Sequence, residues 1–297
     1  MAKRYKGINQ LSPGDKILVA LMIIVPTALV VGLVWIPAIM SVWLSFTNWD
    51  GLGSFSDAHF IGTKNYTDVV SIYPPFWPAI QHNLIWLAVM FLFATPMGMF
   101  IAVLIDREVR FTRFYQTAFY MPVVLALALV GFIWQLIFSR DEGLLNNLTG
   151  STIDWYGDPR YNLWAALVAT SWRHIGYIML LYLAGLKGVD PSLREAASLD
   201  GATEKQTFFK VVFPVLAPIN IIVLVVTVIE SLRAFDLVWI INKGRNGLEL
   251  ISTLVTANVV GEASRIGFGS ALATIMLLIS SVFIVIYLRI VMREDAR

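Results

Sequence analysis

Long runs of apolar residues, separated by polar segments, are the dominant pattern along this chain. Six of these runs reach or exceed the roughly 20 residues that an α-helix needs to cross a bilayer. They cover residues 17–46, 84–105, 117–138, 163–186, 211–231 and 270–291. The pattern therefore predicts an all-α, polytopic membrane protein with six transmembrane helices.

Prolines should disturb two of the six predicted spans. The first span is unusually long and holds Pro26 and Pro37, so we expect it to tilt, kink or begin late. It is too long for the apolar core of a signal peptide and lacks a cleavage site of small residues, so it counts as a span. The fifth span is the weakest, because Pro214 and Pro218 lie at its start and Glu230 at its end.

Composition supports a membrane protein. Hydrophobic residues make up 58% of the chain, charged residues only 14%, and the mean hydropathy is +0.72. Soluble domains carry about 25% charged residues, so this chain is too apolar for a single soluble core. The net charge of +2 argues against a nucleic-acid partner. With no Cys and three scattered His, the chain offers no disulfide, and we expect no metal site.

Basic residues indicate the orientation. With six spans, both termini lie on one side of the membrane, and that side holds fourteen Lys and Arg residues against seven on the other. The positive-inside rule places the richer side in the cytoplasm. Residues 1–16 then form a cytoplasmic N-terminal segment, and residues 17–297 form the transmembrane domain. The outer loops, 47–81, 139–162 and 232–269, are rich in Gly, Pro, Asn and Asp and are predicted to be irregular.

A charged, alanine-rich segment, REAASLDGATEKQTFFKVVFPVLAP, occupies residues 194–218 within the second cytoplasmic loop. Its first helix can begin at Asp190, followed by Pro191, or at the capping box Ser192–Glu195. Gly201 can end that helix in a left-handed conformation.

A second capping box follows directly, at Thr203–Gln206, and the helix that it starts must stop or bend near Pro214. The loop over about 190–214 is therefore predicted to be a helix, a glycine turn and a second helix. By itself this pattern is equally consistent with a short amphipathic connector.

The order EAA, DGA, Gln206, Phe208 and FPVLAP resembles the EAA loop of ATP-binding-cassette importer permeases. Arg194 departs from the family, which commonly has an aromatic residue there. The similarity extends to the carbohydrate-uptake branch, which includes permeases for maltose, multiple sugars and glycerol phosphate. The segments that carry it are WLSFTNWDG (43–51), FIGTKNYTD (60–68), FYMPVVLA (119–126), LLYLAGLKGVDPSLREAASLDGA (180–202), RAFDLVWIIN (233–242) and GFGSALA (267–273).

This resemblance implies a fold like that of type I ABC importers, in the cytoplasmic membrane of a bacterium or archaeon. It also implies a second related permease, two cytoplasmic ATPase domains, an extracytoplasmic solute-binding protein and a carbohydrate cargo. ATP and Mg²⁺ would be bound by the ATPases, because this chain has no G-x-x-x-x-G-K-[ST] phosphate loop. The residues that would couple to the ATPase are Glu195, Ala196, Ala197, Asp200, Gly201 and Ala202.

Polar residues inside spans are costly and usually face a cavity or one another. The candidates for a cargo path are Gln135, Trp172, Arg173, Tyr177, Glu230, Arg233 and Asp236.

Structural explanations compete for most of these candidates. Trp172, Arg173 and the neighbouring His174 can mark the outer membrane interface, with the arginine reaching toward water. Glu230 and Arg233 are three residues apart and can form an ion pair at a helix end. Gln135 can hydrogen-bond to another helix instead of to a ligand.

Two other function classes are alternatives to an importer permease. A secondary transporter would need deep coupling residues and usually an internal repeat, and an intramembrane enzyme would need a buried nucleophile–base pair or a metal cluster. The sequence shows neither set of features clearly. Within the importer interpretation, a sugar-phosphate or glycerol-phosphate ester remains an alternative cargo, because Arg173 or Arg233 could meet a phosphate group.

Overall fold

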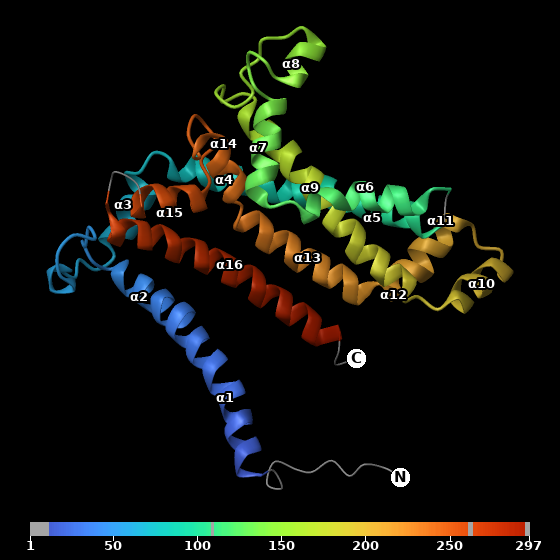
Figure 1. The fold of residues 1–297 in the computed structure, drawn as a ribbon, viewed down its shortest axis with the longest axis horizontal. Coiled ribbons are helices and arrows are strands. Elements are labelled where there is room, and N and C mark those ends of the chain that lie inside the picture. The colour runs from blue at the N-terminus through green and yellow to red at the C-terminus, as the bar shows by residue number, and fades with distance from the viewer. Residues whose placement is uncertain (1–11, 108–109, 261–263, 295–297) are drawn as a thin grey trace.

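The computed structural model describes residues 12–107, 110–260 and 264–294. Regular structure in these ranges is helical (Figure 1). The described residues pair in a strand-like way only at one antiparallel bridge, between Thr47 and Phe60. The predicted all-α class is confirmed.

The helices follow one another in this order. The N-terminal part contains α1 (Pro13–Val30), η2 (Val31–Trp35), α2 (Ile36–Leu44), η3 (Phe55–Asp57), α3 (Lys64–Ser71), α4 (Phe76–Val89), η4 (Met90–Ala94) and α5 (Thr95–Asp106). The middle contains α6 (Thr112–Val124), α7 (Leu127–Ile137), α8 (Leu144–Thr149), α9 (Asn162–Lys187), α10 (Pro191–Leu199), α11 (Glu204–Thr207) and η5 (Phe208–Val212). The C-terminal part contains α12 (Phe213–Val215), α13 (Ala217–Leu232), α14 (Asp236–Asn242), α15 (Ile251–Val259) and α16 (Ile266–Glu294).

Three prolines in long helices are each accommodated by a π-helical turn. The turns η2, η4 and η5 end two residues before Pro37, Pro96 and Pro214, respectively. A proline ring crowds the carbonyl group of the residue four positions earlier. In each of these helices, that residue is the middle one of the π-helical turn, where the backbone is wider. The helices Pro13–Leu44 and Phe76–Asp106 stay continuous as a result. The predicted disturbance of the first span takes this form.

Three helices in the described part of the chain are long and apolar enough to cross a bilayer, namely Pro13–Leu44, Phe76–Asp106 and Ile266–Val285. Two bent helix pairs raise the number to five if each pair is one span. α9 has 26 residues and coincides with the predicted fourth span, but Arg173 and His174 near its middle make it more polar. The count of six spans therefore stays a prediction.

The predicted third span, 117–138, is wrong as a single straight helix. It is divided into α6 and α7, which meet at an angle of 103°. Leu125 and Ala126 between them have extended backbone, with ψ of 139° at both residues. Uninterrupted apolar character does not reveal such a break. The fifth span bends by 75° where α13 begins at Ala217, which confirms the bend near Pro214 but not the predicted start at residue 211.

The expectation of irregular outer loops is also wrong in part, because α3, α8, α14 and α15 lie within them. Two asparagines that suggested loops from sequence are instead buried in these regions. Asn65 is 7% exposed and Asn146 is 3% exposed, and the amide nitrogen of each donates to two backbone carbonyl groups. Each amide therefore holds a local turn in place and satisfies carbonyls that would otherwise be unpaired.

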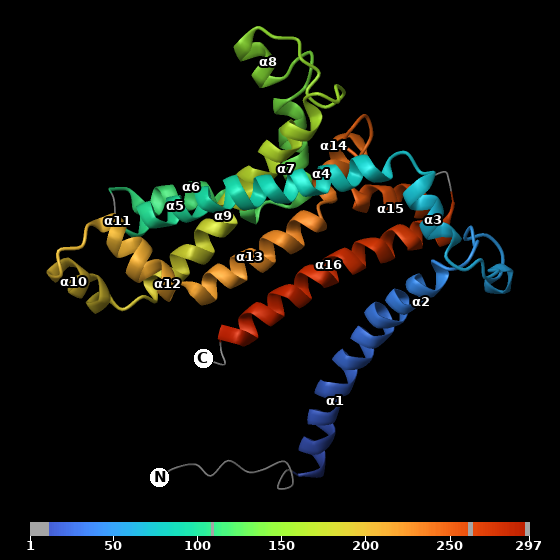
Figure 2. The same cartoon turned by 180° about the vertical axis from the view of Figure 1, so that it is seen from behind.

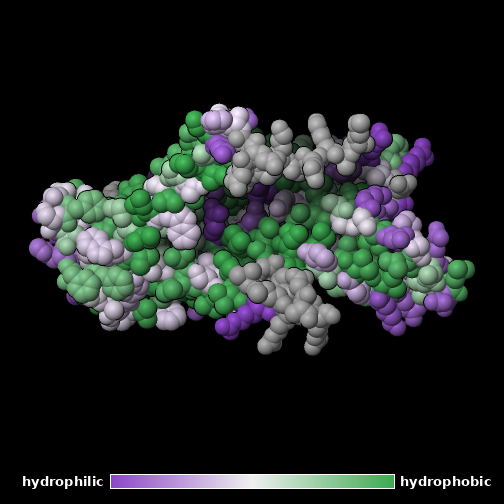
Figure 3. Space-filling view, turned by 90° about the horizontal axis from the view of Figure 1, so that it is seen from below, coloured by the Kyte–Doolittle hydropathy of each residue, from purple (hydrophilic) through white to green (hydrophobic). Residues whose placement is uncertain are grey.

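Helix α1 leaves the rest of the bundle, and α5, α9, α13 and α16 run along a common direction (Figures 1 and 2). No residue of α1 or of η2 is buried. Seen from the side of α1, the middle of the molecule is largely hydrophobic, with hydrophilic residues in a central hollow and at the end where α10 lies (Figure 3). An apolar helix without buried residues must contact lipid or another protein.

Candidate cargo cavity and coupling loop

A cavity of about 190 Å³ lies where α9, α13 and α14 meet. Most of its wall is apolar, with Trp86, Met90, Leu127 and Val130 among the lining residues. Its charged and ionisable residues are Arg173, His174, Glu230, Arg233 and Asp236. Four of the seven cargo-path candidates are therefore gathered around one cavity.

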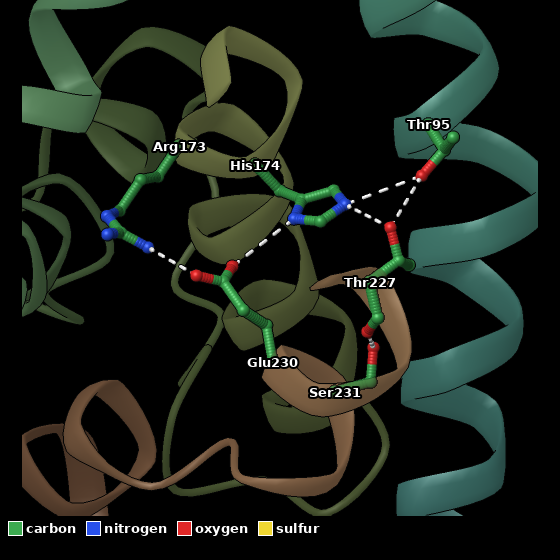
Figure 4. Close-up of polar contacts among 6 residues, drawn as sticks. All are labelled: Thr95, Arg173, His174, Thr227, Glu230 and Ser231. Carbon is green, nitrogen blue, oxygen red and sulfur yellow. Dashed lines mark hydrogen bonds and ion pairs between the residues drawn. The ribbon is translucent and has the colours of Figure 1, made fainter. Parts of the chain in front are cut away.

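His174 is the most buried of these polar residues, with 2% of its surface exposed. Its Nδ1 lies 3.4 Å from Oε2 of Glu230 on α13. Its Nε2 lies 3.2 Å from the hydroxyl of Thr227 and 3.4 Å from the hydroxyl of Thr95 (Figure 4). One imidazole therefore connects α9 with α13 and with the first turn of α5.

In its neutral form, the imidazole can satisfy these contacts in one arrangement of hydrogen bonds. A carboxylate can only accept, so Nδ1 of His174 carries the proton and donates to Glu230. Nε2 is then the acceptor and receives the hydroxyl of Thr227 or Thr95. The two hydroxyl oxygens are 3.3 Å apart, so one threonine can donate to the other and the second to the imidazole. Every polar group in this chain of contacts has a partner, as burial requires.

Glu230 also faces Arg173, whose Nη1 lies 3.7 Å from Oε1 of the carboxylate. The suggested ion pair between Glu230 and Arg233 is not formed. Glu230 points across to α9 instead, and Arg233 lies beyond the end of α13, exposed at the cavity. Spacing along one helix therefore gave the wrong partner, because the neighbouring helix α9 supplies Arg173 and His174 instead. The Nε of Arg173 is buried and has no hydrogen-bond partner.

The other three candidates lie outside this cavity. Gln135 donates from Nε2 to the carbonyls of Ile240 at 2.7 Å and Ile241 at 3.3 Å, so it connects α7 to α14 as the helix–helix alternative predicts. Trp172 packs edge-on against Trp134, with ring centroids 5.8 Å apart. Tyr177 is half-buried and packs against the apolar core between α5 and α9.

Sequence reasoning missed Thr95, Thr227 and Ser231. Thr227 is fully buried, and Ser231 is 1% exposed and donates to the carbonyl of Thr227 at 2.6 Å. Hydroxyl residues in an apolar run commonly hydrogen-bond to their own helix, so none of the three stands out by residue type. The one available signal was the spacing of four residues between Thr227 and Ser231, which places these two on one face of α13.

The predicted helix-turn-helix over about residues 190–214, the candidate coupling loop, is observed. Asp190 caps α10, since its side chain accepts the backbone N–H of Ser192 at 2.9 Å, and Pro191 is the first helical residue. The alternative capping box at Ser192 does not form. Hydrogen bonds from the backbone and side chain of Ser192 lower the pKa of Asp190. The cap therefore keeps a negative charge at the positive end of the helix dipole.

The turn and the second helix also follow the prediction. Gly201 has φ of +76°, a left-handed conformation that glycine adopts without steric cost. Thr203 and Gln206 form the predicted capping box, with the Thr203 N–H donating to Oε1 of Gln206 at 2.8 Å. An open hollow of about 530 Å³ lies between the two helices and is lined by Leu193, Ala196, Ala197, Asp200, Gly201, Ala202, Gln206, Lys210 and Val211.

The predicted coupling residues differ in exposure. Ala197 is 7% exposed and faces inward, whereas Glu195, Ala196 and Asp200 are exposed. The carboxylates of Glu195 and Asp200 form no ion pair or side-chain hydrogen bond within the described part of the chain. The exposed surface of α10 therefore carries a small side chain and two carboxylates, and both carboxylates are available to a basic partner group.

Residues 94–294, well over half of the chain, match the family described as "Binding-protein-dependent transport system inner membrane component". The probable starch degradation products transport system permease protein AmyD of Thermoanaerobacterium thermosulfurigenes is 30% identical over 280 residues, 92% of this chain and 94% of that protein. The arabinooligosaccharides transport system permease protein AraP of Halalkalibacterium halodurans is 30% identical over 238 residues, 75% of this chain and 73% of that protein.

Two solved structures resemble more than nine-tenths of the chain. A bacterial ABC transporter involved in the import of the acidic polysaccharide alginate has a chain with a TM-score of 0.79 and 19% identity, covering 94% of this chain and 96% of that one. The alginate transporter in complex with a periplasmic protein bound to an alginate pentasaccharide gives a TM-score of 0.78 and 20% identity, covering 92% and 93%. At these identities the similarity shows a shared fold.

Proposed function

This chain belongs to the family of binding-protein-dependent transport system inner membrane components, and we propose that it forms half of the path by which an ATP-driven importer moves a carbohydrate across the membrane. Two relatives named for a carbohydrate cargo support this class, since AmyD is named for starch degradation products and AraP for arabinooligosaccharides. The chain itself is a permease subunit and not the enzyme that hydrolyses ATP.

The observation that carries the proposal is that one chain holds both a cavity with apolar and charged walls and an exposed, acidic loop over about residues 190–214. The cavity combines apolar walls with charged groups from Arg173, Glu230, Arg233 and Asp236. A sugar ring needs both, because its faces are apolar and its rim carries hydroxyl groups that donate and accept hydrogen bonds. The second permease subunit would supply the opposite wall of the path.

The coupling loop would seat on a cytoplasmic ATPase. Glu195 and Asp200 offer two free carboxylates, and the small residues Ala196 and Ala202 allow another backbone to approach closely. ATP and Mg²⁺ would be bound by two such ATPase domains. α9 and α13 continue from the two ends of the loop, so a movement of the ATPase would reach the cavity through rigid helices.

The remaining partners follow from the same assignment. An extracytoplasmic solute-binding protein would deliver the cargo, and the fold shared with a transporter solved in complex with such a protein supports this step. The bilayer would be the cytoplasmic membrane of a bacterium or archaeon, with both termini and the coupling loop on its cytoplasmic side. α16 runs toward the side of the molecule where α10 lies, which supports placing the end of α16 and the coupling loop on the same side of the membrane (Figure 1).

A phosphate ester of a sugar or of glycerol is the second candidate cargo. Arg233 lines the cavity and has no ion-pair partner within the described part of the chain, so an anion could bind there. Glu230 and Asp236 in the same wall oppose this, because they would repel a phosphate. The balance of two arginines and two carboxylates favours a neutral cargo.

The test is a binding and uptake panel with the assembled importer and its solute-binding protein. Maltotriose, xylose and arabinotriose represent neutral sugars, and glucose 6-phosphate and glycerol 3-phosphate represent charged esters. We expect tight binding and ATP-dependent uptake for at least one neutral sugar. Uptake restricted to the phosphate esters would favour the second candidate, and ATP-independent uptake would contradict the importer assignment.

A further inference from the structure

Asp106, the last residue of α5, holds two cations from elsewhere in the chain. Its Oδ2 lies 2.9 Å from Nη2 of Arg194 on α10, and its Oδ1 lies 3.3 Å from Nζ of Lys187 at the end of α9. The Asp106 side chain is only 8% exposed, although it lies at a helix end among polar groups. One nearly buried carboxylate therefore contacts both the first coupling helix and the helix that leads into it.

These contacts connect elements that the chain does not join directly. α5 and the coupling loop are separated by α6, α7, α8 and α9 in the sequence. Only residues 188–190 join α9 to α10. The angle between these two helices therefore depends on contacts made beyond that short connection, and the ion pair between Arg194 and Asp106 is one of them.

α5 is a firm support for such a contact because it packs closely on α9. Ile101, Ala102 and Ile105 of α5 are buried in one apolar core with Ile178 and Met179 of α9. At Gly98, an added Cβ would lie 2.8 Å from the carbonyl oxygen of Ile175, so the two helices approach at near-backbone distance. The two helices therefore form one tightly packed unit, and Asp106 lies at the end of α5 that contacts α10.

A neighbouring ion pair shows what distinguishes Asp106. Arg107 and Glu204 approach to 2.9 Å, but their side chains are 51% and 78% exposed. Exposed pairs of this kind are screened by water and salt and contribute little. Asp106 is shielded, and its removal takes one carboxylate away from both Lys187 and Arg194. The pair Arg107–Glu204 is therefore a matched control at the same end of α5.

We propose that Asp106 is a positioning residue for transport coupling. It fixes α10 to the inner end of α5, so that a force on the coupling loop moves α5 together with α9. This role rests on the proposed function, because it assumes that the loop receives its force from an ATPase. Arg194 is the counterpart of Asp106 on the moving element.

Distance measurement by electron paramagnetic resonance tests the positioning directly and needs no cargo. The chain has no Cys, so Leu104→Cys on α5 and Leu199→Cys on α10 give two unique sites for spin labels. Both leucines are exposed, at 40% and 89%. In the assembled importer in lipid nanodiscs, we expect one narrow distance distribution. Asp106→Asn should broaden or shift it, whereas Arg107→Gln should leave it unchanged.

Transport per ATP hydrolysed tests the consequence, with the sugar that the wild-type importer takes up from the panel above. We expect Asp106→Asn to lower this ratio about fivefold, which corresponds to about 1 kcal/mol. Exchanging the charges, with Asp106→Arg and Arg194→Asp together, should restore part of the ratio, although Lys187 then faces a like charge. A residue that only stabilised the fold would reduce the amount of assembled protein without changing this ratio.

The two measurements separate the possible failures. If Asp106→Asn leaves both the distance distribution and the ratio as in the wild type, the positioning role is wrong. If Asp106→Asn prevents assembly, Arg194→Gln removes the same ion pair by changing its more exposed residue. The distance distribution and the transport ratio of that variant then test the positioning role in the same way. If the wild-type importer takes up no sugar, the proposed function fails, and the distance measurement still decides the role of Asp106.

Discussion

The pair of substitutions His174→Asn and His174→Gln separates the two ends of the buried histidine. The amide nitrogen of Asn occupies about the place of Nδ1, so Asn can still donate to Glu230 but not reach the threonines. The amide of Gln extends to about the place of Nε2, so Gln can keep a contact with Thr227 or Thr95 but loses Glu230. If the histidine serves the cavity by holding Glu230, the two variants must differ in transport.

The distances determine the size of the expected effect. Hydrogen bonds to charged groups contribute about 1.5–3 kcal/mol. The contact from Nδ1 to Oε2 is long, at 3.4 Å, and the Glu230 side chain is 40% exposed. We therefore take a value below that range, about 1 kcal/mol, which is about fivefold in rate. Each variant also loses one contact between helices, which in membranes averages about 0.6 kcal/mol, so both should be slightly and equally less stable.

The measurement is the uptake rate of the reconstituted importer at saturating, cargo-loaded binding protein. The binding protein determines the apparent affinity for the sugar, so the rate at saturation reports on the permease. We expect His174→Gln to be about fivefold slower than the wild type, and His174→Asn to be within twofold of it. His82→Gln is the control, because His82 contacts the carbonyl of Glu249 outside the cavity. Equal rates for the Asn and Gln variants would refute the reasoning.

Three further outcomes are expected from the structure. Gly201→Val forces a β-branched residue to φ of +76° and should weaken copurification of the ATPase while membrane insertion continues. Gly98→Val places a Cβ 2.8 Å from a backbone carbonyl of α9 and should destabilise the bundle by about 1–3 kcal/mol in thermal unfolding, whereas Gly32→Val, in open space, should not. A membrane-impermeant thiol reagent should label Leu148→Cys only from outside and Leu199→Cys only from inside, and labelling of both from one side would contradict the topology.

Much of the fold follows from the sequence because apolar length and helix caps are local properties. The first, second, fourth and sixth predicted spans each correspond to a long helix, and the cap at Asp190 and the turn at Gly201 lie where the residues predict them. The expected importer-like fold is confirmed by its match to the solved alginate transporters. The division of 117–138 into α6 and α7 was missed, because two extended residues leave the hydropathy unchanged.

The candidate site was less predictable because it depends on which helices meet. Arg173, Glu230, Arg233 and Asp236 were identified as polar residues in or beside apolar runs, and all four line the cavity. The partner of Glu230 was not identified from the sequence, because spacing along α13 favours Arg233 whereas the observed contacts come from α9.

Asp106 shows the same limit at the other end of the molecule. An acidic residue at the end of a span is unremarkable in sequence, and its cations lie 81 and 88 positions away, as the numbers of Lys187 and Arg194 show. Only the packing of α5 on α9 brings the three together.

The position of the His174 contacts along α9 and α13 suggests how a movement of the coupling loop would reach the cavity. His174 lies 13 residues before the end of α9 and Thr227 lies 10 residues after the start of α13, which at 1.5 Å per residue is about 20 Å and about 15 Å. Apolar packing between these helices would tolerate sliding, because dispersion contacts are not directional. Hydrogen bonds depend on direction, so a small tilt of α9 against α13 would lengthen the contacts of His174 before the two helices separate. Since Arg173 and Glu230 share these contacts, the same tilt would change the charges that the cavity presents to its cargo.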